Sequence, residues 1–570
     1  MLAKIRSSFI LKLTFDHIRN KKRLNIVKYN KSLLSRLNLT KEDFKAYAHL
    51  KEFNEKYNLS IEDVDINELC LSNYHLGNEG FECLAKIKFK GLKKLDLSRN
   101  KISDITLLEK FHFDKLETLN LNYNHISDIN ALEKINLKEL RELNLVNNKI
   151  SEINVLEKVT FDKLEVLNLS NKFVFDSTFG KLGNEISDLN VLGKVNFSHL
   201  KELNFALNKI ENIKALENVN FKELKVLNLG FNNSSDLIPP ILDIKVLEKV
   251  KFEEIEILNL RKLNILDINV FAKVNFPKLK ELSLGDNQIS DINILKDVSF
   301  KDLRKLYFNN NKITDISVLS KVNFVNLESL AINCNNITDI RILEEVPFKE
   351  LKELYLGFNN ISNIEILAKI DFKELRVLDI SGIKSQDMNF LEKFKFEHLE
   401  VLDLSFNNIE DIHVLAKVNF LNLKELNLKR NQISDLKAFE NEQFHNLEKL
   451  NLCGNKLSNI HTLKYLKFNE LKELDLGCNG IYDIRIFKEL NLQKLEKLKL
   501  DYNIISDIKV FEKANLTNLK ILDLRYNMIS DISILDKVKI KKVLLDWNEV
   551  ELPEKSLLDK IEQMYIDDDY

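Results

Sequence analysis

The sequence predicts an α/β fold of the solenoid type, in which short parallel strands alternate with helical turns in stacked coils. The pattern LxxLxLxxNxIxDIxxLxxxxFxx recurs along most of the chain, and most of its copies are 24 residues apart. The copies begin at Leu92, Leu116, Leu140, Leu164, Leu200, Leu224, Ile255, Leu279, Leu303, Leu327, Leu351, Leu375, Leu399, Leu423, Leu447, Leu471, Leu495 and Leu519. The interval after Leu164 is 36 residues and the interval after Leu224 is 31. We therefore expect one repeat array over residues 66–550.

Each part of a repeat has a physical role, as the copy that begins at Leu92 illustrates. Leu95 and Leu97 are two residues apart, so both point to one side of a strand. In the turn ISDI that follows, we expect the isoleucines to point inward and Asp104 to cap a short helical turn. Leu108 and Phe113 then close the far wall of the coil. A coil cannot bury these groups alone, so the array is stable only when coils stack.

An asparagine follows the strand in most repeats and is the most specific feature of the pattern. It occurs as Asn100, Asn124, Asn148, Asn208, Asn232, Asn287, Asn311, Asn335, Asn359, Asn407, Asn431, Asn455, Asn479, Asn503 and Asn527. Because an amide both donates and accepts, stacked asparagines can pair with buried backbone groups of the loop. Leu263 and Ile383 interrupt the series, and we expect Asn184 to replace the asparagine after an insertion.

These repeats resemble those of the leucine-rich-repeat superfamily over roughly residues 66–550. The sequence NxIxDIxxL is similar to the short repeats of bacterial internalins and of cytosolic phosphatase-regulating repeat proteins. The repeats of this chain are longer, with EKxxF added on the side away from the strands. The resemblance implies a right-handed horseshoe, with a parallel sheet on its concave face and short helical turns on its convex face.

Both ends of the chain depart from the repeat, and we expect them to cap the array. Residues 1–65 have helical apolar spacing and predict a helical N-terminal cap. Their start, FILKLTFDHI followed by KKRLNIVKYNKSLL, also resembles an F-box, a module that docks repeat proteins onto a ubiquitin ligase. The leading Leu-Pro and the later Trp of that family are absent. Residues 551–570 predict a capping helix, near 554–566, and an acidic tail.

Composition and motifs argue against several classes of function. The 85 basic and 87 acidic residues nearly balance, which argues against a nucleic-acid or anionic membrane surface. No apolar stretch of membrane-spanning length occurs, and the five cysteines lack the spacing of a zinc site or a disulfide framework. No GxSxG, HExxH or Gly-rich phosphate loop occurs. We expect a monomeric cytoplasmic protein that is not an enzyme and has no cofactor or metal.

The expected function is protein binding. Aromatic residues at strand ends and centres are candidates to anchor a partner because they bury a large area at a low entropy cost. These candidates are Tyr123, Phe231, Tyr307, Tyr355, Phe358, Phe406, Tyr502 and Tyr526. Alternatively, neighbouring rings only pack on one another.

The two insertions supply a second set of candidates, since insertions in repeat proteins often map to the binding face. Their apolar residues are Phe173, Phe175, Phe179, Leu237 and Ile238. Neutral loops that fold back on the array are the alternative. Three roles follow for the whole chain: a scaffold or adaptor for a protein partner, a substrate receptor of a ubiquitin ligase, and a regulatory subunit of a protein phosphatase.

Overall fold

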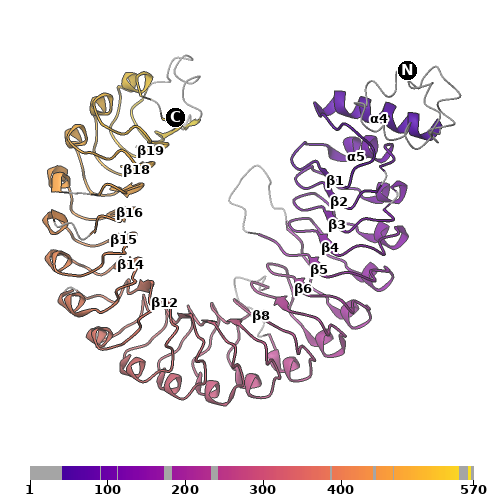
Figure 1. The fold of residues 1–570 in the computed structure, drawn as a ribbon, viewed down its shortest axis with the longest axis horizontal. Coiled ribbons are helices and arrows are strands. Elements are labelled where there is room, and N and C mark those ends of the chain that lie inside the picture. Colours follow the sequence, from indigo (N-terminus) through magenta and orange to yellow (C-terminus); the bar gives the residue numbers. More distant parts are fainter. Residues whose placement is uncertain are drawn as a thin grey trace, which may run out of the picture. The chain divides into compact units, whose positions relative to one another are not determined.

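The computed structural model describes residues 41–89, 91–111, 113–172, 183–232, 242–385, 388–440, 444–465, 468–538, 540–550 and 563–565. The chain divides into two compact units, Met1–Leu279 and Lys280–Tyr570. Each unit is a solenoid of stacked coils, with a parallel sheet on one side of the stack and short 3-10 helices on the other (Figure 1). This arrangement confirms the fold class that the repeat predicts.

The first unit begins with a helical cap. Helix α4 (Lys41–Tyr57) packs on helix α5 (Gly77–Ala85), and Leu50, Phe53 and Phe81 are buried. Neighbouring strands pair in parallel from β1 to β8. The strands are β1 (Glu68–Cys70), β2 (Lys94–Asp96), β3 (Thr118–Asn120), β4 (Glu142–Asn144), β5 (Val166–Asn168), β6 (Glu202–Asn204), β7 (Val226–Asn228) and β8 (Ile257–Asn259). The 3-10 helices are η2 (Thr106–Lys110), η3 (Asn130–Lys134), η4 (Asn154–Glu157), η6 (Asn190–Gly193), η7 (Lys214–Asn218), η8 (Ile244–Glu248) and η9 (Asn269–Ala272).

The second unit repeats this plan, with neighbouring strands paired in parallel from β9 to β21. The strands are β9 (Glu281–Ser283), β10 (Lys305–Tyr307), β11 (Ser329–Ala331), β12 (Glu353–Tyr355), β13 (Val377–Asp379), β14 (Val401–Asp403), β15 (Glu425–Asn427), β16 (Lys449–Asn451), β17 (Glu473–Asp475), β18 (Lys497–Lys499), β19 (Ile521–Asp523), β20 (Lys542–Leu544) and β21 (Gln563–Tyr565). The 3-10 helices are η10 (Asn293–Asp297), η11 (Ser317–Ser320), η12 (Arg341–Glu344), η13 (Ile364–Ala368), η14 (Asn389–Lys393), η15 (His413–Ala416), η16 (Lys437–Glu440), η18 (Ile460–Tyr465), η19 (Arg485–Lys488), η20 (Lys509–Glu512) and η21 (Ser533–Asp536).

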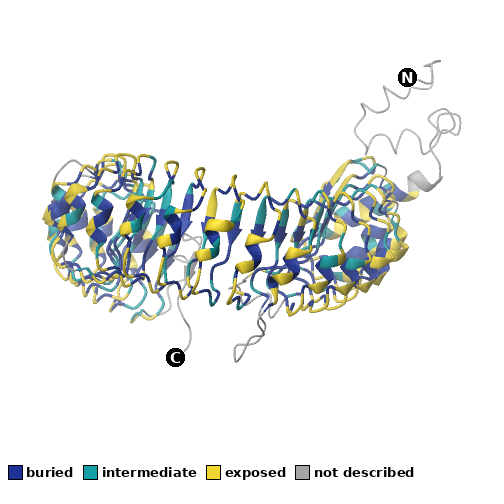
Figure 2. Cartoon of the chain, turned by 90° about the horizontal axis from the view of Figure 1, so that it is seen from below, coloured by how far each residue is buried: buried dark blue, intermediate teal, exposed yellow. Residues whose placement is uncertain are grey.

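The core lies between the sheet and the 3-10 helices. In the coil of β2, Leu95, Leu97, Ile102 and Leu108 are fully buried or nearly so, as the alternation predicts. Each such side chain contributes about 1.5–3 kcal/mol when it is fully buried. Asp104 accepts a hydrogen bond from the backbone N–H of Thr106 at 2.8 Å, which caps η2 as expected. In Figure 2 the exposed residues lie along the loops at the two edges of the coils and on the 3-10 helices, and the strands carry many of the buried residues.

The asparagine series forms the predicted ladder. Asn124 donates from Nδ2 to the carbonyls of Leu97 and Leu121 at 3.0 Å, and its Oδ1 accepts from the N–H of Ile102 at 2.9 Å. Asn184 takes over after the first insertion, since it donates to Leu145 and Leu169 and accepts from Ile150. The ladder therefore satisfies buried backbone groups in both neighbouring coils.

The C-terminal end differs from the prediction in one respect. Gln563–Tyr565 form strand β21, which pairs in parallel with β20, where the sequence predicts the end of a capping helix. The open edge of β20 offers unpaired backbone groups, and an extended segment satisfies them where a helix cannot. The rest of that helix and of the acidic tail, and the F-box-like residues 1–40, lie outside the described residues.

Candidate functional site

The residue just before each ladder asparagine lies at the edge of the sheet, and we call it the edge position. The chain turns away here, three residues after the strand ends, with a positive φ between 53° and 62° at the seven aromatic examples. Six of the predicted binding residues occupy it: Tyr123, Phe231, Phe358, Phe406, Tyr502 and Tyr526. The edge residue still donates its backbone N–H to the next coil, as Phe358 does to Ser381 at 2.7 Å. The fold therefore fixes the backbone position from which each of these aromatic side chains extends.

Aromatic residues are not the residues that this backbone favours. Gly382 and Gly454 occupy the same position with φ of 61° and 71°, a conformation that glycine adopts without strain. A residue with a Cβ loses about 1–2 kcal/mol in the left-handed region. The aromatic rings at the edge position are therefore explained by what the side chains contact, and not by backbone preference.

In the second unit, the edge position carries two exposed aromatic clusters. Phe358 and Phe406 are 46% and 40% exposed, and their ring centroids are 5.5 Å apart. Farther along, Tyr502, Tyr526 and Trp547 form a continuous parallel stack, with centroid distances of 4.1 and 5.4 Å. Trp547 was not among the sequence candidates, although its place before Asn548 is the signal that identifies it. The structure thus brings together four of the candidates and adds one.

In the first unit, cationic groups cover the edge aromatics. The guanidinium of Arg99 lies 4.2 Å from the ring centroid of Tyr123, and that of Arg261 lies 5.1 Å from the ring of Phe231. In these cation–π contacts, an arginine of the same chain already occupies a face of each ring. Both rings are half-buried, whereas Phe358, Phe406 and Tyr502 of the second unit are exposed. Among the described residues at the edge position, those of the second unit therefore offer the more accessible aromatic surface.

Tyr307 and Tyr355 lie in strands β10 and β12 and not at the edge position. Their side chains are on the open face of the sheet, which is the face opposite the buried leucines, and both are half-buried. Burial raises the pKa of Tyr355 to about 12, and the neighbouring Glu353 carboxylate adds to the effect. Burial also raises the pKa of Tyr307. Both phenols are thus hydrogen-bond donors at neutral pH.

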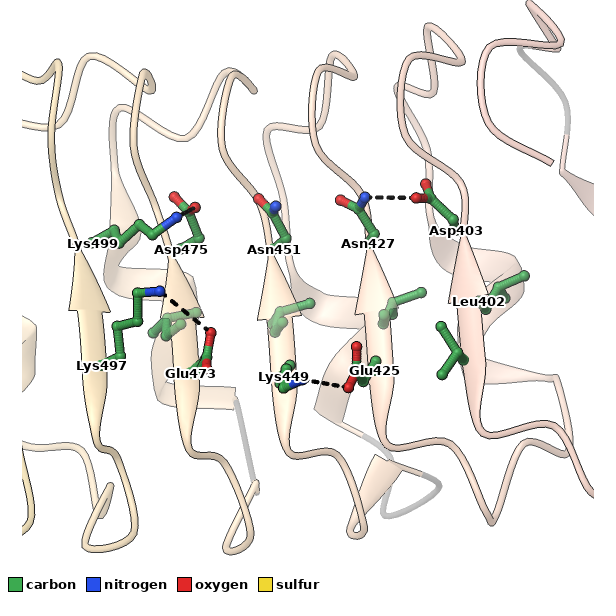
Figure 3. Close-up of a pocket in the computed structure, with 14 residues that line it drawn as sticks. Leu402, Asp403, Glu425, Asn427, Lys449, Asn451, Glu473, Asp475, Lys497 and Lys499 are labelled. Carbon is green, nitrogen blue, oxygen red and sulfur yellow. Dashed lines mark hydrogen bonds and ion pairs between the residues drawn. The ribbon is translucent and has the colours of Figure 1, made fainter. Parts of the chain in front are cut away.

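The open face of the second unit contains a shallow groove of about 240 Å³ across strands β14 to β18 (Figure 3). Its polar side chains form two rows, one from the first residue of each strand and one from the last. These side chains are Glu425, Lys449, Glu473 and Lys497 in one row and Asp403, Asn427, Asn451, Asp475 and Lys499 in the other.

Most charges in the groove are balanced within it. The Lys449 ammonium lies 2.5 Å from the Glu425 carboxylate, and the Lys499 ammonium lies 2.9 Å from that of Asp475. The groove is therefore a polar surface on which positive and negative side chains alternate. Because these charges are paired, the groove suits contact with a surface that carries both signs of charge better than it suits binding of one isolated ion.

Two carboxylates at one end of the groove are less well balanced. Asp379 of β13 and Asp403 of β14 are direct partners in the parallel register. Burial raises the pKa of Asp379 despite a hydrogen bond from Ser381, and the nearby Asp403 raises it further. Asp403 accepts hydrogen bonds from the Ser405 N–H and from Asn427 Nδ2, both at 2.8 Å. Sequence analysis did not single out this acidic pair.

Among the described residues, no group of three or more His, Cys, Asp or Glu side chains is placed to hold a metal ion. The aspartates of the turns cap 3-10 helices, as Asp411 does by accepting from the His413 N–H at 2.8 Å. No helix in the described ranges has the length and apolar character needed to cross a membrane. The insertion candidates Phe173, Phe175, Phe179, Leu237 and Ile238 lie outside the described residues.

Family models for leucine-rich repeats match several stretches of the chain. A two-copy model, "Leucine Rich repeats (2 copies)", matches residues 90–134, 301–345 and 493–537. Two further leucine-rich-repeat models match residues 397–457 and 277–292. No curated protein matches the sequence.

Several solved structures are similar to this chain. An internalin from Listeria monocytogenes is 29% identical, over 55% of this chain and 87% of its own, with a TM-score of 0.44. A leucine-rich-repeat protein of Leptospira interrogans is 21% identical, over 72% of this chain and 96% of its own, with a TM-score of 0.47. The mouse RP105/MD-1 complex is 21% identical, over 87% of both chains, with a TM-score of 0.50. The two likenesses at 21% identity concern the fold alone.

Proposed function

Because this chain belongs to the leucine-rich-repeat superfamily, we propose that it is a non-catalytic protein-binding scaffold whose second unit holds a protein partner on the open face of its sheet. One observation carries the proposal. Exposed aromatic rings line the edge position of the second unit, beside a polar groove on the same sheet. Protein interfaces are enriched in aromatic residues and also contain paired polar groups, and this surface offers both.

The aromatic clusters supply the anchors of this interface. Phe358 and Phe406 mark the coils at one end of the groove, and Tyr502 and Tyr526 mark those at the other end. Rings that are already stacked lose little side-chain entropy when a partner covers them, so most of their buried area contributes to affinity. The groove between them discriminates among partners by charge, because its lysines and carboxylates have fixed places.

The proposal extends to the setting in which the protein works. All five cysteines are free thiols, which supports a reducing, cytoplasmic location. We also propose that the protein is a monomer before it meets its partner. The ligase-receptor and phosphatase-regulator roles remain predictions from the sequence. A pull-down with and without residues 1–40 tests the first, and phosphatase activity in the purified complex tests the second.

Affinity purification of the tagged full chain, followed by mass spectrometry, tests the proposed function. Asn451→Arg places a long charged side chain in the middle of the groove, on strand β16. Asn293→Arg makes the same change on the exposed helix η10, on the opposite side of the second unit, and is the matched control.

We expect specific partners to be retained by the unchanged protein and by Asn293→Arg, and to be lost by Asn451→Arg. Identical partner sets for all three proteins would contradict the proposal. Capture of no protein beyond a tag-only control would contradict it as well.

A further inference from the structure

We infer that the Phe358–Phe406 pair and the Asp379–Asp403 pair together form one site for a basic side chain, arginine above all, presented by an apolar segment of a protein partner. The inference rests on the proposed function and specifies the chemistry of the partner. It concerns strands β12 to β14 and the loops that follow them, at one end of the groove.

Two glycines leave room for the Phe358 ring and the Asp379 carboxylate. A Cβ on Gly357 would lie 2.6 Å from Oδ1 of Asp379 and nearer still to the Ser381 hydroxyl, so these two groups together occupy the space above the residue that precedes Phe358. A Cβ on Gly382 would lie 2.6 Å from Cδ1 of Phe358, so the phenyl ring occupies the space above that glycine. The absence of two side chains thus leaves room for the carboxylate over Gly357 and for the phenyl ring over Gly382, on two neighbouring coils.

Within the described strands β12 to β14, no cation balances the carboxylates. The strands read ELY, VLD and VLD, and none contains a lysine or an arginine. The cations at their starts are engaged elsewhere, since Lys352 pairs with Glu328 at 2.9 Å and Arg376 pairs with Glu400 at 2.7 Å. In strands β15 to β18, by contrast, lysines and carboxylates alternate and pair. The excess of negative charge is therefore local to β12–β14.

The surroundings of the acidic pair favour a cation carried on an apolar stem. Val377 and Val401 precede the two aspartates by two residues, on the same face, and both are half-buried. The methylene groups of an arginine can cover these valines while its guanidinium reaches the carboxylates. The exposed phenyl rings beside them contact a cation or an apolar neighbour favourably. A carboxylate that is already partly desolvated gains more from such a partner than an exposed one does.

A random peptide library displayed on phage and selected on the immobilised full-length protein tests the inference. We expect the enriched peptides to contain arginine or lysine next to an aromatic or aliphatic residue. Synthetic versions should bind the unchanged protein at least about tenfold more tightly than the variant Asp379→Asn with Asp403→Asn. The double variant Phe358→Ala with Phe406→Ala should bind the same peptides more weakly than the unchanged protein does.

The matched control removes the same charge from the opposite side of the second unit. Asp411 and Asp435 cap the outer helices η15 and η16, and Asn459 fills the equivalent role in η18 by accepting from the His461 N–H. Asp411→Asn with Asp435→Asn should therefore keep both the caps and the peptide affinity. Thermal melting of all variants verifies that each is folded.

Several results would overturn the inference. They are enrichment of peptides without basic residues, equal binding to the acidic-pair variant, equal loss in the control variant, and no enrichment at all. If proteins are captured by the unchanged chain and lost by Asn451→Arg while the acidic-pair variant retains them, the proposed function stands and only the inference fails.

Discussion

Replacement of a single ladder asparagine by alanine should destabilise two coils at once. Asn431 is buried, and its Oδ1 accepts hydrogen bonds from the N–H groups of Asn407 and Ile409, both at 3.0 Å. Its Nδ2 donates to the carbonyls of Leu404 and Leu428, also at 3.0 Å. Asn431→Ala removes all four interactions while it leaves the apolar contacts of the coil in place.

The magnitude follows from the groups that lose a partner. A buried polar group without a hydrogen bond costs about 1–3 kcal/mol, so the two N–H groups together cost about 2–6 kcal/mol. The carbonyls add less because each has a second lone pair. Asn431 is 7% exposed, so water can replace part of the loss. We expect a local free-energy cost of about 2–4 kcal/mol.

Hydrogen exchange measured by mass spectrometry gives the local value, because a solenoid opens coil by coil. Amides of the coils around Asn407 and Ile409 should exchange faster by the corresponding factor. Asn422→Ala is the control, since the exposed Asn422 makes only a carbonyl contact, to Glu397 at 2.8 Å, and should cost within about 0.5 kcal/mol. Equal protection in the two variants would refute the role given to the ladder.

Three further predictions concern packing, stacking and pH. Leu402→Ala should cost about 2–5 kcal/mol, because Leu402 is fully buried between coils, and unchanged protease resistance there would contradict its placement. Tyr526→Ala removes the central ring of the aromatic stack and so uncovers Trp547, which is the one tryptophan of the chain. Quenching of its fluorescence by acrylamide should therefore increase, and unaltered quenching would count against the stack. Folding raises the pKa of Asp379 above its ordinary value of 3.8, so the folded state binds a proton more readily than the unfolded state does. As the pH falls from neutral through the raised pKa to 3.8, the free energy of unfolding should therefore rise relative to that of Asp379→Asn. Urea titrations of the two proteins at each pH measure this difference. A difference that is constant with pH would contradict this.

The sequence by itself determined the coil. The leucines, the turn aspartates and the ladder asparagines each depend on contacts within one coil or with the next, so a 24-residue period places them without further information. The sequence also predicted that Asn184 takes the place of the asparagine missing from the repeat that begins at Leu164, because the backbone carbonyls of that coil still need a hydrogen-bond donor. The period also identified six of the seven aromatic residues at the edge position.

Only the tertiary structure decided which of those aromatics are available. The same position is covered at Tyr123, where Arg99 lies over the ring, and exposed at Phe358, where the next coil has a glycine. Such differences depend on pairs of variable side chains in neighbouring coils, and the repeat pattern does not specify them. For the same reason, the sequence did not predict that the Asp379 carboxylate lies over Gly357 of the neighbouring coil.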